Sequence, residues 1–434
     1  MSENSCGLVS AVGRTSGARA LPSPVFVILS FEGPDDYARA GGLGARVTGL
    51  TYALAEAGFE THLFFIGAPD AEGHEIACAG RLHLHRWCQW ISRHHPGGVY
   101  DGEEHKLDDW NRSLPPWLEA NVLGACAAAG RSAVVIGEEW QTSSTITRLG
   151  ARGKEAQWGG LVRFFWNANN TFGFERVPWQ ALRESATITT VSRFMKHEMW
   201  RLDVDARVLP NGIAAQWLSP CDQRAVRALR RAAEARLLLA KIARWDPDKR
   251  WLMAVDAVLD MKRRGLRPLL VARGGVEPHG VEVVRHAEAA GLVVRALTCE
   301  DGSPSALCRA VAAGSSGDIV MLESRLSRAQ LQCLYRASDA VLANSGIEPF
   351  GLVGLEAMAS GGVAFLGATG EDYASPGHDA ISLQTNRADE ITSNVLRLRQ
   401  RPELAHRLRY AAKRTGARYT WDHVIQTHIL PMLA

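Results

Sequence analysis

The stretch at residues 344–362, NSGIEPFGLVGLEAMASGG, is the part of the sequence that decides the fold. It follows a short apolar run at 339–343 that predicts a buried strand, and a helix is predicted to begin near Phe350. A loop between a strand and a helix presents unpaired backbone N–H groups that attract anions such as phosphate. Open α/β sheets bind ligands at the carboxyl ends of their strands. The stretch therefore predicts an anion site beside Glu348 and Glu356.

A second glycine-rich turn lies near the start of the chain. Residues 25–31 form a continuous apolar run typical of a buried strand, and a helix is predicted over 45–57. Between them, the string GGLG at 41–44 would let the backbone approach a phosphate or a sugar. The pattern G-x-G-x-x-G is missing from both halves of the sequence, which argues against an NAD-linked oxidoreductase.

Composition narrows the function classes. The net charge of +3 in 434 residues argues against dedicated nucleic-acid binding, which normally needs a strongly basic face. No apolar run approaches the roughly 20 residues that span a bilayer, although loose peripheral contact with a membrane stays open. The eight cysteines form no C-x-x-C pair, so reduced thiols and a cytoplasmic location are expected.

Histidines gather around residues 83–95, in and after the strand-like run LHLHRW. They could form a metal site, but their spacing matches no standard zinc pattern. A strand with outward-facing histidines is favoured, and no metal is expected.

The spacing of Glu348 and Glu356, with PFG between them, resembles the E-x7-E element of retaining GT-B glycosyltransferases, a group that includes glycogen and starch synthases. In that family the first Glu lies beside the transferred sugar, and the second binds the nucleotide ribose. The resemblance implies the GT-B fold: two Rossmann-like, doubly wound parallel-sheet domains facing a central cleft. It also implies donor contacts from Phe350, Gly351 and Leu352.

The glycine turn resembles the K-x-G-G-L-G element of the same family, which contacts the donor diphosphate. The resemblance implies donor contacts from Gly41, Gly42 and Gly44. Arg39 stands at the position of the family's Lys, which keeps the charge but changes its geometry. The alternative is a tight turn with no ligand.

A pair of cations follows the first strand of the second half. Arg244 and Lys249 match the family's R-x-x-x-x-K arrangement, in which both cations hold the donor diphosphate. Two fixed cations can stabilise the developing charge of a nucleoside diphosphate leaving group without a metal. We therefore expect catalytic roles for Arg244, Lys249 and Glu348.

The strand at 162–165 runs into WNANN, where the family carries His-Asn or His-Asp near the sugar hydroxyls. Trp166 stands at the position of the His, and an indole cannot accept a proton as an imidazole does. Asn167 keeps the second position and is expected to contact the sugar, while a cluster of Asx turns is the alternative. Nearby, EEW at 138–140 resembles the family's H-D-W segment.

Strands alternate with predicted helices in both halves of the chain, which is typical of two doubly wound α/β domains. Residues 101–123 are expected to form irregular structure and helix. We expect a disordered tail at 1–24, a first domain at 25–209, a linker at 210–234, a second domain at 235–415 and a C-terminal helix at 416–434 that packs back on the first domain.

The resemblance implies a metal-independent, retaining transferase that needs no cofactor and moves a hexosyl unit from a nucleotide diphosphate sugar to an acceptor hydroxyl. The acceptor could be a glycan, a lipid-linked glycan or a small molecule. An NDP-sugar epimerase or a phosphorylase of the same fold, or a catalytically impaired scaffold, remain alternatives.

Overall fold

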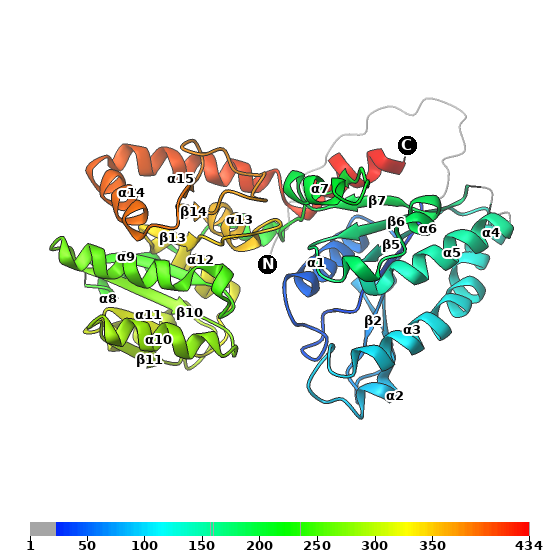
Figure 1. Ribbon diagram of the computed structural model, residues 1–434, viewed down its shortest axis with the longest axis horizontal. Coiled ribbons are helices and arrows are strands. Elements are labelled where there is room, and N and C mark those ends of the chain that lie inside the picture. Colours follow the sequence, from blue (N-terminus) through cyan, green and yellow to red (C-terminus); the bar gives the residue numbers. More distant parts are fainter. Residues whose placement is uncertain (1–22, 157, 159, 235, 434) are drawn as a thin grey trace, which may run out of the picture.

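The computed structural model describes residues 23–156, 158, 160–234 and 236–433. The described chain forms two lobes, each built around a parallel sheet with helices on both faces (Figure 1). This architecture confirms the predicted fold class. The tail expected at 1–24 lies, up to residue 22, outside the described residues.

The first lobe holds an eight-stranded sheet in the order β3-β4-β2-β1-β5-β6-β7-β8. All of its pairings are parallel except the antiparallel pair of β3 and β4 at the edge. The central strand β1 is fully buried because helices cover both faces, which explains its uninterrupted apolar sequence. The strands are β1 (Val25–Leu29), β2 (Thr61–Ile66), β3 (His74–Ala77), β4 (Leu82–Trp87), β5 (Ala133–Glu138), β6 (Val162–Ala168), β7 (Thr187–Thr190) and β8 (Arg207–Val208).

Two features of the first lobe differ from the sequence expectations. Helix α1 begins at Gly42, three residues before the predicted start at 45, because the glycines themselves form its first turn. The segment at 101–123 is mostly the long helix α3, which tolerates Pro115 and Pro116 in its last turns. The helices of this lobe are α1 (Gly42–Glu56), α2 (Gln89–Ser92), α3 (Glu103–Leu118), α4 (Gly124–Ala128), α5 (Ser143–Glu155), α6 (Trp179–Ser185) and α7 (Arg193–Trp200).

The second lobe holds a seven-stranded parallel sheet in the order β11-β12-β10-β9-β13-β14-β15. Its central strand β9 lies between β10 and β13. The strands are β9 (Leu237–Ile242), β10 (Pro268–Arg273), β11 (Val294–Leu297), β12 (Ile319–Leu322), β13 (Ala340–Ala343), β14 (Ala364–Leu366) and β15 (Ile381–Ser382). The helices are α8 (Gln223–Ala232), α9 (Trp251–Arg263), α10 (His279–Ala289), α11 (Pro304–Gly314), α12 (Arg328–Ala337), α13 (Leu352–Ala359), α14 (Ala388–Gln400), α15 (Pro402–Ala417) and α16 (Trp421–Val424).

The end of the chain passes from the second lobe back to the first, as the red segment of Figure 1 shows. Trp421, at the start of α16, packs against two glycines of the first half. An added Cβ would lie 2.3 Å from the Trp421 indole at Gly49 and 2.4 Å from it at Gly212, so no larger residue fits at either position. Beside it, Ile213 pairs with Thr420 in an isolated bridge. The helix α8, inside the expected linker, packs on α11 and α12 of the second lobe.

Contacts also join the two lobes away from this crossing. Arg325, after β12, donates a hydrogen bond of 2.9 Å to the carboxylate of Asp36 in the loop after β1. Asp372 accepts a hydrogen bond from the backbone N–H of Arg193, the first residue of α7. Among the described residues, no helix is long and apolar enough to cross a membrane.

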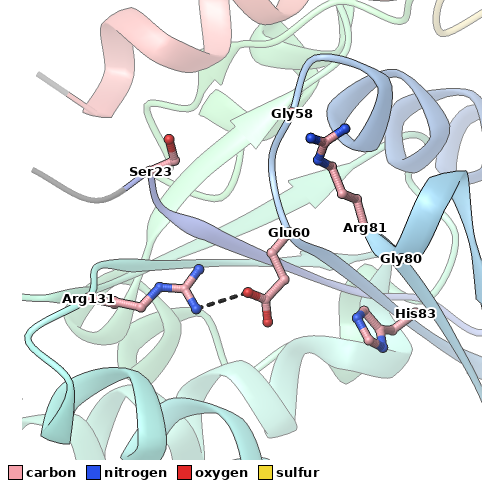
Figure 2. A pocket seen from close by; sticks show the side chains of 7 residues that line it. All are labelled: Ser23, Gly58, Glu60, Gly80, Arg81, His83 and Arg131. Carbon is pink, nitrogen blue, oxygen red and sulfur yellow. Dashed lines mark ion pairs between the residues drawn. The ribbon is translucent and has the colours of Figure 1, made fainter.

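A cavity of about 600 Å³ lies on the first lobe (Figure 2). Its lining residues lie at the amino ends of strands, just before them except for His83, which is the second residue of β4. They are Ser23, Gly58, Glu60, Gly80, Arg81, His83 and Arg131. Because α/β sheets bind their ligands at the carboxyl ends of strands, this cavity is not at the predicted site.

Candidate active site

The turn between β13 and α13 brings two carboxyl groups together around a glycine. Gly351 caps α13 in the left-handed region with φ of +79°. A Cβ at Gly351 would lie 3.1 Å from the side chains of Glu348, Glu371 and Tyr373. Glycine is therefore required both by the backbone conformation and by the close approach of these groups.

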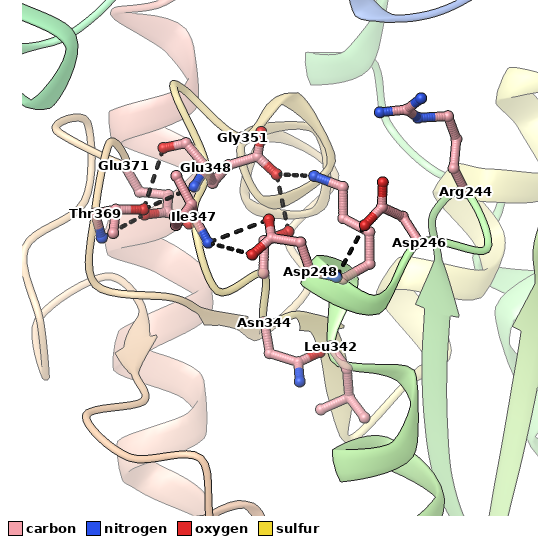
Figure 3. Close-up of polar contacts among 12 residues, drawn as sticks. Arg244, Asp246, Asp248, Leu342, Asn344, Ile347, Glu348, Gly351, Thr369 and Glu371 are labelled. Carbon is pink, nitrogen blue, oxygen red and sulfur yellow. Dashed lines mark hydrogen bonds and ion pairs between the residues drawn. The ribbon is translucent and has the colours of Figure 1, made fainter. Parts of the chain in front are cut away.

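Glu348 and Lys249, 99 residues apart in the sequence, form an ion pair at the carboxyl end of the second sheet (Figure 3). The Lys249 Nζ lies 2.8 Å from Glu348 Oε2, and the Ser345 hydroxyl donates to the same oxygen at 2.9 Å. Both side chains of the ion pair are about one-fifth exposed, at 18% and 21%. The structure thus brings together two of the predicted catalytic residues and leaves both reachable by a ligand.

The loop that carries Arg244 and Lys249 is tied to the turn that carries Glu348. The Asp248 carboxylate accepts hydrogen bonds from the backbone N–H of Ile347 at 2.9 and 3.2 Å. The backbone N–H of Gly346 donates to the carbonyl of Asp248 at 2.7 Å. Arg244 is exposed, and no described residue bonds its guanidinium, which stands apart from the bonded groups in Figure 3. Arg244 is therefore free to bind an anion beside the Glu348–Lys249 pair.

Two further carboxyl groups belong to this region: Glu371 lies beside Gly351, and Glu356 is on α13. Burial, with a further contribution from the neighbouring charge of Glu348, raises the pKa of Glu371 to about 7. Burial of the Glu356 carboxyl group raises its pKa to about 8, although α13 leaves the residue partly exposed. No described residue hydrogen-bonds the Glu356 side chain, so it could bond a ligand. Glu371 was not predicted as a site residue, and the only signal for it is its glycine-rich turn, GATGE.

The carboxylate of Glu32 hydrogen-bonds the backbone of the glycine turn in the first lobe. One oxygen of the Glu32 carboxylate accepts the backbone N–H groups of Ala40, Gly41 and Gly44 at 3.2, 2.9 and 2.9 Å. The other oxygen accepts the hydroxyl of Tyr100 at 2.8 Å. Glu32 therefore already supplies the anion that the N-terminus of α1 attracts. The N–H groups of Gly41 and Gly44, expected to contact the donor diphosphate, are engaged in this structure.

The rest of the glycine turn faces the second lobe. A Cβ at Gly42 would lie 4.0 Å from the side chain of Leu352, so these two predicted donor-binding residues are neighbours across the lobes. Arg39 is exposed beside the turn, and its guanidinium donates to the Pro34 carbonyl. Phe350 differs from the expectation, because its ring is 3% exposed and packs against Tyr373. Its side chain belongs to the core, which leaves only its backbone for a ligand.

Asn167 is fully buried, which differs from its expected contact with the sugar. Its amide donates to Glu138 at 2.9 Å, and its carbonyl oxygen accepts from the Thr189 hydroxyl at 2.9 Å. Glu138 in turn is held by Arg46 at 3.0 Å. Because both ends of the amide are engaged in this buried network, Asn167 presents no free group to a ligand here.

Glu139, next to Glu138, has a backbone conformation that side chains rarely adopt. Its φ is +67° and its ψ is 168°, a region populated mainly by glycine. Several hydrogen bonds hold it. Its carbonyl accepts the indole N–H of Trp166 at 2.9 Å and also the hydroxyl of Thr142 at 3.0 Å, and its carboxylate accepts the backbone N–H of Asn169 at 2.7 Å. Trp166, at the position of the family's His, thus braces the backbone from inside the core.

Within the described part of the chain, no group of three or more His, Cys, Asp or Glu side chains is arranged to hold a metal ion. Four histidines of the first sheet instead form two hydrogen-bonded pairs. The ring nitrogens of His62 and His85 lie 3.1 Å apart, and those of His74 and His83 lie 3.2 Å apart. The rings of the two pairs stack on one another, with centroids 4.6 Å apart for His62 and His83.

Comparisons with known proteins support the assignment of the fold. Residues 304–415 match the family model of the glycosyl transferases group 1. The structure resembles a sucrose-phosphate synthase from Thermosynechococcus elongatus, with a TM-score of 0.65 and 18% identity over 94% of this chain and 98% of that one. The chain has the GT-B fold. The GT-B resemblance inferred from the sequence is thereby confirmed for the fold and for the matched segment.

Two other solved structures share the GT-B fold with this chain. The catalytic domain of starch synthase IV from Arabidopsis thaliana, bound to ADP and acarbose, has a TM-score of 0.63 and 15% identity, covering 94% of this chain and 99% of that one. HepE from Anabaena, in complex with UDP, has a TM-score of 0.62 and 12% identity, with the same coverages. No curated protein sequence matches the chain.

Proposed function

We propose that this protein is a glycosyltransferase that moves a hexosyl unit from a nucleotide diphosphate sugar to an acceptor hydroxyl, with retention of the anomeric configuration. The observation that carries the proposal is the convergence of Arg244, Lys249 and Glu348 at the carboxyl end of the second sheet. Support also comes from the family match over 304–415 and from the ADP and UDP named in two similar structures.

The charges of the site suit a nucleoside diphosphate leaving group. Arg244 has no partner among the described residues. Lys249, on the same loop as Arg244, forms an ion pair with Glu348. Two fixed cations in a partly dehydrated site stabilise the charge that develops on the departing diphosphate. We assign this role to Arg244 and Lys249, so the proposal requires no metal ion.

Glu348 is the group that we place beside the transferred sugar. In the proposed step, the bond between the sugar C1 and the diphosphate oxygen breaks, and the acceptor oxygen bonds C1 from the same face. The acceptor proton passes to the departing phosphate oxygen. Lys249 and Ser345 hold Glu348 in place, and its free oxygen would accept hydrogen bonds from the sugar. Closure of the two lobes would exclude water, which otherwise hydrolyses the donor.

Glu356 and the glycine turn complete the proposed donor site. Glu356 has no partner among the described residues, and a carboxyl group can both accept and, when protonated, donate hydrogen bonds to the ribose hydroxyls. Gly42 meets Leu352 across the lobes, and Arg39 is the exposed cation of that turn. We propose that Gly42 and Arg39 cover the diphosphate from the first lobe.

The test is a binding and turnover screen with ADP-, UDP- and GDP-sugars on wild type, Arg244→Ala and Glu348→Gln. We expect one donor to stabilise the wild type thermally. Arg244→Ala should need at least a tenfold higher donor concentration for the same thermal stabilisation. Glu348→Gln should still bind the donor but lose most of the turnover. Arg263→Ala removes an exposed arginine from the same lobe and should behave like wild type.

The same screen separates the alternative functions. Turnover that requires inorganic phosphate would indicate a phosphorylase, and release of free NDP with an epimerised sugar would indicate an epimerase. If no nucleotide sugar binds and both variants match wild type, the proposal is wrong and the chain is a scaffold.

A further inference from the structure

Lys241 is a fully buried lysine in the central strand of the second sheet. It is 1% exposed, and its Nζ donates to the Asn344 side-chain oxygen at 2.6 Å and to the Leu342 carbonyl at 3.3 Å. The same Nζ lies 5.0 Å from the ring centre of Trp251. No carboxylate of the described chain forms an ion pair with it. Lysines are almost never buried in this way without a charged partner, so this placement needs an explanation.

The partners of Lys241 belong to the two turns that form the candidate donor site. Asn344 is the first residue of the turn that carries Glu348, and both turns are already joined through Asp248. Trp251, under the ammonium group, donates its indole N–H to the carbonyl of Arg244 at 2.7 Å. Lys241 therefore contacts, from inside the sheet, the Asn344 side chain of one turn and the Trp251 side chain that bonds the other turn.

The charged groups around Lys241 also come from these turns. The pKa of Lys241 is lowered to about 7, first by burial and then by the charges of Lys249 and Arg250, while the charge of Glu348 opposes this shift. From α9, the neighbours are uncharged: Trp251, and Met253 behind Asn344. Lys241 thus sits below a cluster of cations whose charge a bound diphosphate would neutralise.

We propose that Lys241 is a positioning residue of the donor site, and that it takes up a proton when the diphosphate of a nucleotide sugar binds. The inference rests on the proposed function, because it names how the same site responds to its donor. The anionic ligand offsets the repulsion from Lys249 and Arg250, so the ammonium form of Lys241 becomes more favourable. A charged Lys241 forms the stronger hydrogen bond to Asn344 and so fixes the turn of Glu348.

Protonation on binding predicts a direction for the pH dependence. A ligand that raises the pKa of a group binds more tightly where that group is protonated. Donor affinity should therefore fall as the pH rises through 7, by roughly threefold to tenfold between pH 6.5 and 8.5. A lysine with a merely structural role would leave donor affinity independent of its protonation.

The first experiment follows Lys241 directly. The chain contains seven lysines, so the ¹³Cε signals of selectively labelled lysine are few, and Lys241→Met identifies the signal of interest. We expect this signal to titrate near pH 7 in the free protein. Asn344→Asp places a carboxylate on the ammonium and should raise the midpoint by more than about one unit. A Lys241 signal that stays charged up to pH 9 in wild type overturns the inference.

The second experiment counts protons on donor binding. Titration calorimetry with UDP-glucose, ADP-glucose and GDP-mannose is performed at pH 7.5 in two buffers of different ionisation enthalpy, because the donor diphosphate diester itself does not titrate there. We expect uptake of roughly half a proton in wild type. Lys241→Met should lose this uptake, whereas Lys262→Met, which removes an exposed lysine of the same lobe, should keep it.

The outcomes separate this inference from the proposed function. If a donor binds with equal proton uptake in wild type and Lys241→Met, the proposed function stands and the role of Lys241 is wrong. If no nucleotide sugar binds wild type, the proposed function fails and the coupling fails with it, even where Lys241 titrates near pH 7. Two carboxyl groups of the site, Glu356 and Glu371, can also exchange protons. Subtracting the proton uptake of Lys241→Met from that of wild type removes their contribution.

Discussion

The indole N–H of Trp166 donates a 2.9 Å hydrogen bond to the backbone carbonyl of Glu139, a residue held at a φ of +67°. This bond gives a structural role to the tryptophan that stands where the sequence resemblance implied a histidine. The side chain turns into the core, where it also packs edge-to-face against Trp179 with ring centroids 5.6 Å apart. Trp166 therefore fixes the loop after β5 without reaching a ligand.

Trp166→Phe should destabilise the protein by about 1–2 kcal/mol, since it opens a small cavity and removes the indole donor of the Glu139 carbonyl, which then keeps only the backbone N–H and the hydroxyl of Thr142 as donors. Urea unfolding measures this change. Trp200→Phe, at a side chain that is 54% exposed, should change the free energy of unfolding by less than about 0.5 kcal/mol. Equal stability of wild type and Trp166→Phe would contradict the bracing role.

Glu32→Gln should loosen the first turn of α1. The carboxylate accepts three backbone N–H groups at the positive end of the helix, and a neutral amide binds them less strongly. We expect a loss of about 1–2 kcal/mol in stability and faster amide hydrogen exchange at residues 40–44. Unchanged exchange at these amides would show that Glu32 does not hold the turn. Glu60→Gln, at an exposed ion pair of the same lobe, is the control.

Gly351→Ala should be costlier than Gly265→Ala, a substitution at another glycine with positive φ. Gly265 has a φ of +75° and no atom within 4 Å of an added Cβ, so Gly265→Ala meets only the backbone cost of about 1 kcal/mol. At Gly351 the new methyl group also crowds Glu348, Glu371 and Tyr373 at 3.1 Å. We expect at least about 1 kcal/mol of additional destabilisation and a loss of turnover. Equal effects of the two substitutions in chemical unfolding would argue against this crowding.

Glu356→Gln should change the pH dependence of stability. The pKa of Glu356 is about 8 in the folded protein, above its ordinary value, so the folded state binds its proton more tightly than the unfolded state. Its contribution to stability is present at acidic pH and is lost as the pH rises toward 8. Glutamine has no proton to lose, so the variant should be similar to wild type at pH 5 and more stable by about 1–2 kcal/mol at pH 8.5.

The measurement for Glu356 is urea unfolding at both pH values, with donor binding measured in parallel. Because we place Glu356 on the nucleotide ribose, Glu356→Gln should gain stability at pH 8.5 and lose donor affinity. A variant whose stability follows wild type at both pH values would show that the carboxyl group is not protonated in the folded state. The pH dependence of the difference in unfolding free energy between wild type and Glu356→Gln isolates the contribution of Glu356, because Lys241 contributes equally to both proteins.

Much of the fold could be predicted because its signals are local. Apolar runs marked the buried strands, and β1 at Val25–Leu29 lies within the apolar run predicted at 25–31. The pairing of Lys249 with Glu348 was accessible because parallel strands bring their carboxyl ends to one edge. The edge strand β3 was missed, since its four residues are mostly exposed and carry no apolar alternation.

The other differences depend on partners that are distant in the sequence. Asn167 is buried because Glu138 is held by Arg46, 92 residues before it, and nothing near Asn167 indicates that network. Gly41 and Gly44 are engaged by Glu32, which sequence patterns cannot place under the helix. Lys241 carries no signal of its own in an apolar strand. Its significance depends on Asn344, which is 103 residues away.

The bridge between Ile213 and Thr420 has a mechanical meaning. The chain leaves the first lobe and returns to it through the same point, where Trp421 fills the space above Gly49 and Gly212. Two connections that run side by side resist sliding and stretching, but they permit rotation. The lobes can therefore open only by rotating about the Ile213–Thr420 bridge. A larger side chain in place of Gly212 would displace Trp421 and with it the axis of this rotation.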